Sequence, residues 1–330
     1  MSITIKASTA ADFLALIPTL TGHNPKGNLL TIPFSGTRTV GAIRLDLPQS
    51  RTEAQFGPSL VGILARIELV DSVVIAAYPE YTDHPRLDAF IDELKATLDQ
   101  AGYAVKDALV IDPEHYHSRM DERHEPHPVS EITDAAERLG YSMAKPAYGT
   151  DQPLDVGRLS IPHIRALMRQ MDSGLAMWEE YFEEALLAVH AGTHTNLDVA
   201  RIGMGLTRLP QRDQILPGIV RGRVHDELGA DMELLVGDTT EIPEYPVLRR
   251  GHTVMRVLAE ASETDEEESM AIAHVGWFDW ASGLGTAAHR SFVRACAIDP
   301  QNTLAGLLDR FIGTGVMPSW AYAAADRNAR

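Results

Sequence analysis

The sequence predicts an α/β fold: a mixed sheet with a βαβ unit in the N-terminal third, followed by a mainly α-helical region. A hairpin pattern over residues 28–48 and a strand–helix–strand pattern over 70–112 predict the sheet, and helical periodicity from residue 161 onward predicts the rest. We therefore expect two domains, an α/β domain at residues 1–125 and a mainly helical domain at 126–330 packed on it.

The first elements are a helix and a hairpin. Thr9 and Asp12 make a capping-box pattern before an apolar stripe, and Pro18 should shorten or kink this helix. The segment 28–34 reads as a strand, and the turn "SGT" leads into a second strand within 38–48.

A βαβ unit follows the hairpin. Residues 70–79, "VDSVVIAAYP", form a continuous apolar run, which is typical of a strand covered on both faces. A helix with its apolar stripe over 87–98 separates this strand from the next, at 103–112, and this spacing predicts that the two strands are parallel. Residues 112–160 are rich in histidine, proline and charge, so we expect a loop or insertion there with one short helix at 130–139.

Three features are expected in the helical region. The acidic run "ETDEEES" at 263–269 reads as a solvated connection between helices, and a last helix should begin at Asp299 and end at Gly313. One long helix should carry a buried face formed by Leu175, Trp178, Phe182, Ala185 and Val189.

Composition excludes several classes of partner and compartment. The chain has 29 basic and 46 acidic residues, a formal net charge of −17, so nucleic acid is not an expected partner. No apolar run reaches the ~18–20 residues that span a bilayer, and the first residues lack the apolar core of a signal peptide, so we expect a cytoplasmic protein without membrane contact. The single cysteine, Cys296, rules out an intrachain disulfide and agrees with a reducing compartment.

The segment "TGHNPKGN", residues 21–28, superficially resembles a phosphate-binding loop. It lacks the Lys-Ser/Thr pair of a P-loop, and a helix precedes it where a strand should stand. We interpret it as a helix-to-strand turn. His23 in this turn, with Arg44 and Asp46 two residues apart on one strand face, forms the candidate ligand-binding group at the end of the sheet. The alternative is that Arg44 and Asp46 form an ion pair that only fixes strand register.

The histidine pairs raise the question of a metal. His190 and His194 have helical spacing, but Gly192 lies between them, so His194 should fall in an interhelical turn. The motifs "HYH" and "HEPH", at 115–117 and 124–127, lie in the expected loop, where polar residues need no ligand. We predict no metal site and no cofactor. No Gly-x-Ser-x-Gly motif is present, so no catalytic residue can be assigned.

The opening segment "DFLALIPTLTGHNPKGNLLTI", followed by "GAIRLDLP", resembles the start of an uncharacterised actinobacterial family, domain of unknown function 4192. The matching positions include Pro18, Gly22, His23, Arg44 and Asp46. The segment "AIAHVGWFDWASGLGTAAHRSFVRACAIDPQNTLAGLLDRFIGTGVMPSW" is similar to the family's C-terminal part. The resemblance supports the fold and a one-chain architecture, and it implies no reaction.

Three function classes remain open. We favour a non-catalytic ligand- or protein-binding scaffold, because the signatures of a nucleophile, a P-loop and a dinucleotide site are missing. One alternative is a small-molecule enzyme with its site at the sheet end, and another is a component of a mobile-element or phage assembly. Whether the chain is an enzyme stays uncertain from the sequence, and so does its oligomeric state.

Overall fold

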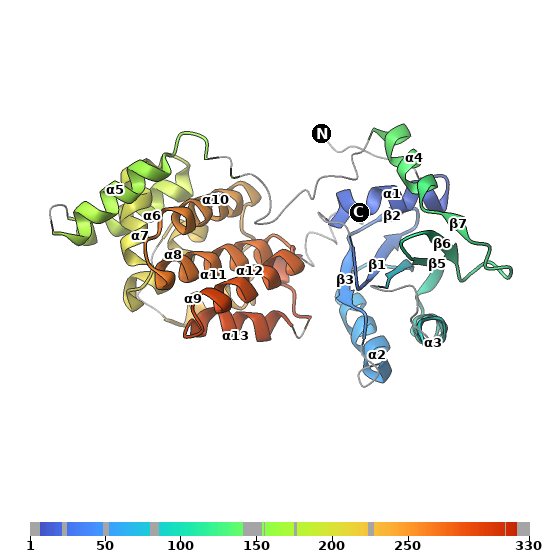
Figure 1. Ribbon diagram of the computed structural model, residues 1–330. Coiled ribbons are helices and arrows are strands. Elements are labelled where there is room, and N and C mark those ends of the chain that lie inside the picture. Colours follow the sequence, from blue (N-terminus) through green and yellow to red (C-terminus); the bar gives the residue numbers. More distant parts are fainter. Residues whose placement is uncertain are drawn as a thin grey trace. The chain divides into compact units, whose positions relative to one another are not determined.

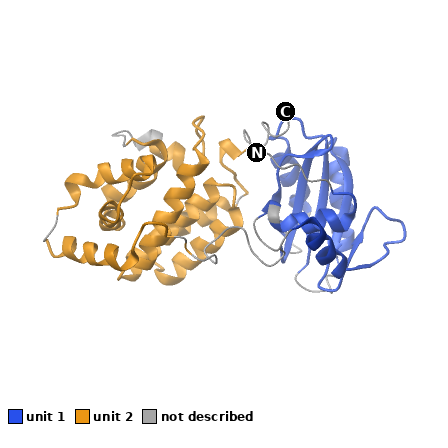
Figure 2. Ribbon diagram, turned by 90° about the horizontal axis from the view of Figure 1, so that it is seen from above, with its two compact units in different colours: residues 1–148, 322–330 blue, residues 149–321 orange. Residues whose placement is uncertain are grey.

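The computed structural model describes most of the chain, and the described part divides into two compact units. The first unit is formed by residues up to 148 and the second by residues 149–321 (Figure 2). The described residues are 7–21, 25–48, 53–79, 86–140, 154, 156–174, 177–223, 228–313 and 315–321.

The first unit combines helices with one seven-stranded sheet (Figure 1). Its elements, in chain order, are α1 (Ala10–Thr21), β1 (Asn28–Ser35), β2 (Arg38–Thr39), β3 (Ile43–Asp46), α2 (Glu53–Leu64), β4 (Ser72–Tyr78), α3 (Leu87–Gln100), β5 (Ala104–Ile111), β6 (His115–Ser118), β7 (His127–Pro128) and α4 (Ser130–Leu139).

The sheet confirms the predicted α/β class and the βαβ unit. Its strand order is β2-β1-β4-β5-β6-β7, with β3 also paired to β1. Strands β4 and β5 are parallel and are connected through α3, whereas the other pairs are antiparallel. The second strand of the predicted hairpin exists as two pieces, β2 and β3, which pair with opposite ends of β1.

Helices cover both faces of this sheet. Neighbouring residues of β1 and β4 point to opposite faces, so each strand contributes side chains to the core on either side. Leu29 and Ile75 pack into the core under α2 and α3. Leu30 and Val74 pack into a second core, which α1 and α4 cover. This two-sided burial explains why both central strands are almost continuously apolar.

The histidine-rich segment after β5 was predicted as a loop, and that prediction is wrong in part. Residues 115–118 and 127–128 form β6 and β7, which extend the sheet beyond β5. Sheet pairing uses backbone groups, so polar side chains at an exposed edge do not prevent it.

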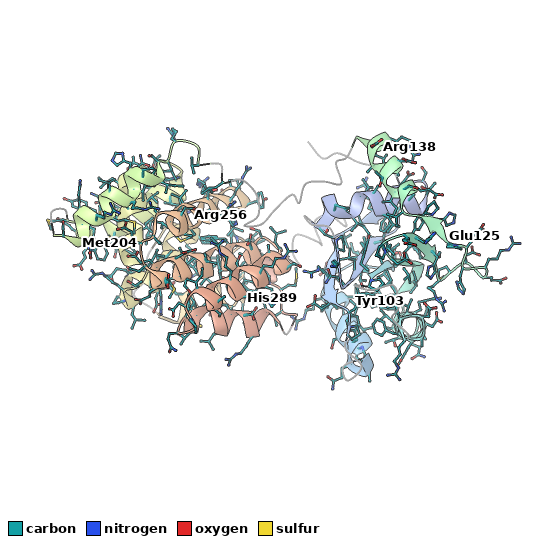
Figure 3. The ribbon with its side chains drawn as sticks, viewed as in Figure 1. Tyr103, Glu125, Arg138, Met204, Arg256 and His289 are labelled. Atoms are coloured by element: carbon teal, nitrogen blue, oxygen red, sulfur yellow. The ribbon has the colours of Figure 1, made fainter. Side chains whose placement is uncertain are left out.

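The helix at 130–139 was assigned to the second domain, with a boundary at residue 125. The structure instead places α4 in the first unit, where it packs on α1. Arg138, labelled in Figure 3, forms an ion pair with the buried Asp12 of α1.

Among the described residues, the second unit contains helices and no strand. Its elements are α5 (Ile161–Asp172), the 3-10 turn η1 (Glu179–Tyr181), α6 (Phe182–Ala191), α7 (Asn196–Gly205), α8 (Leu209–Arg221), α9 (Leu228–Leu235), α10 (Tyr245–Ala261), α11 (Asp265–Ala281), α12 (Gly285–Ile298) and α13 (Thr303–Ile312).

Helix α11 forms the centre of this unit and packs against α10, α12 and α13 (Figure 1). Every residue from 269 to 281 is buried, as expected of a helix that is surrounded by others. The acidic run before it is not the predicted connection. It forms the first turn of α11, where Thr264 caps the helix and negative charge favours the positive end of the helix dipole.

The predicted long helix over residues 175–189 is also corrected. Trp178 precedes the turn η1, and α6 begins only at Phe182. Trp178 and Phe182 are both buried and pack edge to face with ring centroids 6.0 Å apart. The apolar face was therefore identified correctly, but its first part is not α-helical. Leu175 lies outside the described residues.

The last helix begins later than predicted. Asn302, rather than Asp299, is its N-cap, because the Asn302 side chain accepts a hydrogen bond from the Ala305 backbone N–H at 3.0 Å.

Candidate functional site

The structure places Arg44 and Asp46 together on β3, beside the first residue of β1. In the antiparallel register, Asp46 lies opposite Asn28. Asp46 Oδ1 accepts a hydrogen bond from Asn28 Nδ2 at 2.9 Å and another from Arg44 Nη2 at 3.3 Å. The side chain of Asp46 is 81% exposed, and that of Arg44 is 21% exposed. The bond to Asn28 joins β3 to β1, which fits a role in fixing register.

The third predicted residue of this group, His23, lies outside the described residues. Just before β1, the Lys26 backbone N–H donates to Asn28 Oδ1 at 3.1 Å. Asn28 thus uses both ends of its amide, one for the turn and one for Asp46. Sequence reasoning missed Asn28, although it is the buried member of the group.

The histidines around β6 make separate, local contacts. His127 stacks on Tyr116 with a ring-centroid distance of 5.2 Å, and its Nδ1 lies 3.6 Å from a Glu131 carboxylate oxygen. The Tyr116 hydroxyl donates to that carboxylate at 2.8 Å. Burial and this contact raise the pKa of Tyr116 to about 12.

The rings of His117 and His124 meet edge to face at a centroid distance of 6.4 Å. Burial lowers the pKa of His117, which disfavours its charged form. Within the described parts of the chain, no group of three or more His, Cys, Asp or Glu side chains is arranged to hold a metal ion.

The pair His190 and His194 is split as predicted. Helix α6 ends at Ala191, and Gly192 adopts the left-handed conformation that terminates it. His194 therefore lies in the turn before α7, which Thr195 caps. His190 Nδ1 lies 3.0 Å from the backbone carbonyl oxygen of Ile219 in α8.

A buried carboxylate in the helical unit, Asp279, lies between a serine and a histidine. His252 Nε2 is 3.2 Å from Asp279 Oδ1, and Ser291 Oγ donates to Asp279 Oδ2 at 3.4 Å. A serine nucleophile requires the histidine to lie next to the hydroxyl so that it can take its proton. Here the carboxylate occupies that central position, so the group connects α10, α11 and α12 instead.

A second buried polar group joins the ends of three helices. Ser269 Oγ donates to the Ala295 carbonyl at 2.8 Å and accepts from Asn302 Nδ2 at 2.8 Å. Because Asn302 also caps α13, this group fixes the start of α13 against α11 and α12.

Next to that group lies a cavity of about 570 Å³. It lies where α8, α11 and α13 begin and where α12 ends. Its lining mixes carboxylates, hydroxyls, amides, one guanidinium and apolar side chains: Thr207, Leu209, Arg212, Asp265, Glu266, Met270, Ile298, Asp299, Gln301, Asn302 and Thr303.

Part of this lining is already bonded internally. Asp299 Oδ1 accepts from the Gln301 backbone N–H at 2.9 Å. Arg212 Nε donates at 2.9 Å to Asp213, which does not line the cavity. The side chains of Asp265 and Glu266, by contrast, are exposed and make no hydrogen bond or ion pair with the described residues. The cavity lining thus includes two carboxylates without a partner among the described residues, together with apolar side chains.

In a comparison with family models, the chain matches the domain of unknown function 4192 over residues 11–130 and 118–319. The chain belongs to this family. No curated protein and no solved structure matches the chain. The family match includes strands β1 and β3 as well as every residue that lines the cavity.

For this member of the family, the cavity was not foreseen from sequence, since its lining comes from three separate segments, residues 207–212, 265–270 and 298–303. The available signals were local ones: Thr264 followed by four acidic residues is an N-terminal helix signature, and Asn302 is another N-cap. None of the described helices is long and apolar enough to cross a membrane.

Proposed function

We propose that this family member is a cytoplasmic, non-catalytic binding protein, and that its ligand site is the cavity between the starts of α8, α11 and α13. The cavity is the observation that carries the proposal. Its volume, about 570 Å³, falls within the range of about 300–1,000 Å³ of small-molecule sites. The single unpaired cysteine of the chain supports a reducing compartment.

The internal bonding of the other polar groups supports binding over catalysis. At the sheet end, Asp46 accepts hydrogen bonds from Arg44 on its own strand and from Asn28 on β1. In the helical unit, Ser291 bonds to Asp279 and not to a histidine base. The cavity can bind a ligand through its own lining, and neither the group at the sheet end nor the Asp279 group is needed for that.

The test is a ligand-observed NMR screen of small fragments against the full chain, with two matched tryptophan variants. Leu209 is 62% exposed and lines the cavity, so Leu209→Trp should fill it without disturbing the core. Leu187 is also exposed, but it lies on α6 away from the lining, so Leu187→Trp serves as the control.

We expect fragments that bind the wild-type chain to lose binding in Leu209→Trp and to keep it in Leu187→Trp. Saturable binding that is equal in both variants would refute the cavity as the site. Turnover of a bound fragment would refute the non-catalytic assignment.

A further inference from the structure

The acidic run at the start of α11 separates into two kinds of residue. Glu263 forms an ion pair with Arg169, and Glu268 pairs with Arg294 at 3.0 Å. Glu267 accepts a hydrogen bond from the Glu263 backbone N–H at 3.2 Å. These three carboxylates have partners on the protein.

The two remaining acidic residues of the run, Asp265 and Glu266, are the ones that line the cavity. Their carboxylates have no partner among the described residues, as shown above. The run therefore leaves unpaired only those charges that face the cavity. The helix dipole alone would explain why acidic residues occur in this turn. It would not explain why the carboxylates without a partner are the ones that line the cavity.

The charge of the lining favours a cation. Asp265, Glu266 and Asp299 contribute three negative charges, and Arg212 is the basic residue among the described lining residues. Asp213 already neutralises that guanidinium through an ion pair at 2.8 Å. A helix N-terminus carries only about half a positive charge, so the helix ends do not reverse the sign. The net charge of −17 adds to the attraction at long range.

The rest of the lining indicates an organic cation. The carboxylates do not form a group that could hold a metal ion within the described parts of the chain. Leu209, Met270 and Ile298 provide an apolar surface of the kind that binds hydrocarbon groups. A ligand that pairs with the carboxylates and also contacts the apolar surface needs a cationic group at one end and an apolar body.

We propose that the cavity binds a small organic amine, whose ammonium group pairs with Asp265 and Glu266 and whose apolar body lies against Leu209, Met270 and Ile298. This inference rests on the proposed function, because it assigns a ligand class to the same cavity.

Three probes of nearly equal shape test the charge: phenethylamine, phenethyl alcohol and 3-phenylpropionate, which are cationic, neutral and anionic near neutral pH. Their affinities for the full chain are measured by titration calorimetry at low ionic strength. We expect phenethylamine to bind at least about tenfold more tightly than the other two, and added salt to weaken its binding, because the carboxylates are exposed.

The matched variants remove two charges from the same helical turn. Asp265→Asn with Glu266→Gln should weaken phenethylamine binding about tenfold or more. Glu267→Gln with Glu268→Gln removes two carboxylates outside the lining and should change the affinity less than about threefold. Circular dichroism of each variant verifies that its helices are retained.

Tighter binding of the alcohol or the acid, binding of none of the three probes, or an unchanged affinity in the Asp265/Glu266 variant would overturn the amine assignment. The fragment screen with Leu209→Trp decides the proposed function separately. If the fragments whose binding is lost in Leu209→Trp carry no positive charge, the proposed binding function is supported and the amine class is refuted.

Discussion

At the scale of single residues, Asp46 links β3 to β1, because its carboxylate accepts a hydrogen bond from Asn28 of β1 as well as one from Arg44 of its own strand. Sequence alone left two interpretations of the Arg44–Asp46 spacing, a ligand group or an ion pair for register. The hydrogen bond to the buried Asn28 supports register, since a buried amide that loses its acceptor destabilises the fold.

We predict that Arg44→Ala and Asp46→Ala each lower the free energy of unfolding by about 0.5–1 kcal/mol, the range for partly exposed bonds. The double variant should cost little more than Asp46→Ala alone, because Asp46→Ala already removes the bond to Arg44. Thermal melts of the three variants measure this. Unchanged or raised stability in both single variants would contradict a role in fixing strand register. It would instead favour a ligand site at this end of β3.

His274 is a buried titratable residue whose environment opposes its charge. It is 1% exposed, and its Nδ1 lies 2.8 Å from the Met270 backbone carbonyl. Burial lowers its pKa to about 4, against the opposing effect of that carbonyl. The unfolded chain therefore binds a proton near pH 6.5 that the folded chain does not bind until about pH 4.

Because the unfolded state binds more protons in this window, stability is fully present above about pH 6.5 and falls toward about pH 4. The free energy of unfolding of the wild-type chain should therefore fall between about pH 7.5 and pH 4.5. We predict that this fall is smaller by roughly 2 kcal/mol in His274→Gln, which lacks the titrating imidazole. Urea titrations at both pH values measure it. The exposed His163→Gln is the control and should keep the wild-type difference; an equal difference in His274→Gln would contradict the assignment.

At the scale of elements, two helices approach each other closely where a glycine removes a side chain. A Cβ atom on Gly276 of α11 would lie 2.6 Å from the ring of Phe292 in α12. Both helices are held at this distance by the central packing of α11, so the ring cannot withdraw without loss of contacts.

We predict that Gly276→Ala destabilises the helical unit by about 1–3 kcal/mol, the usual cost of overpacking, although alanine favours helix. Gly306→Ala in α13 is the matched control. Beyond its chain neighbours and its own helix backbone, no heavy atom lies within 4 Å of its added Cβ, so it should stabilise by up to about 1 kcal/mol. Urea midpoints measure both variants, and a stabilised Gly276→Ala would show that α12 can move away.

Elements differ in how far the sequence determines them. The strands β4 and β5 and the helix α3 were predicted because their apolar patterns directly reflect burial. Strands β6 and β7 were missed, since pairing at a polar edge depends on backbone geometry that leaves no side-chain pattern. The cavity was missed for a related reason, as its segments meet only in the folded helical unit.

At the scale of the whole molecule, the two units have separate cores. The cores of the first unit use residues between 11 and 136, and the core of the second uses residues between 159 and 320. All four tryptophans of the chain, Trp178, Trp277, Trp280 and Trp320, are buried in the second core. Their fluorescence therefore reports the helical unit alone, whereas far-ultraviolet circular dichroism reports both units.

We predict that the two signals respond differently to variants in different units. Gly276→Ala should move the urea transition seen by fluorescence, because its clash lies beside the tryptophans of α11. Arg44→Ala should leave fluorescence unchanged and shift only the part of the dichroism transition that belongs to the sheet unit. Separate cores lead to this expectation, since a unit with its own core unfolds as its own cooperative transition. Coincident shifts of both signals in both variants would instead show that the units unfold as one.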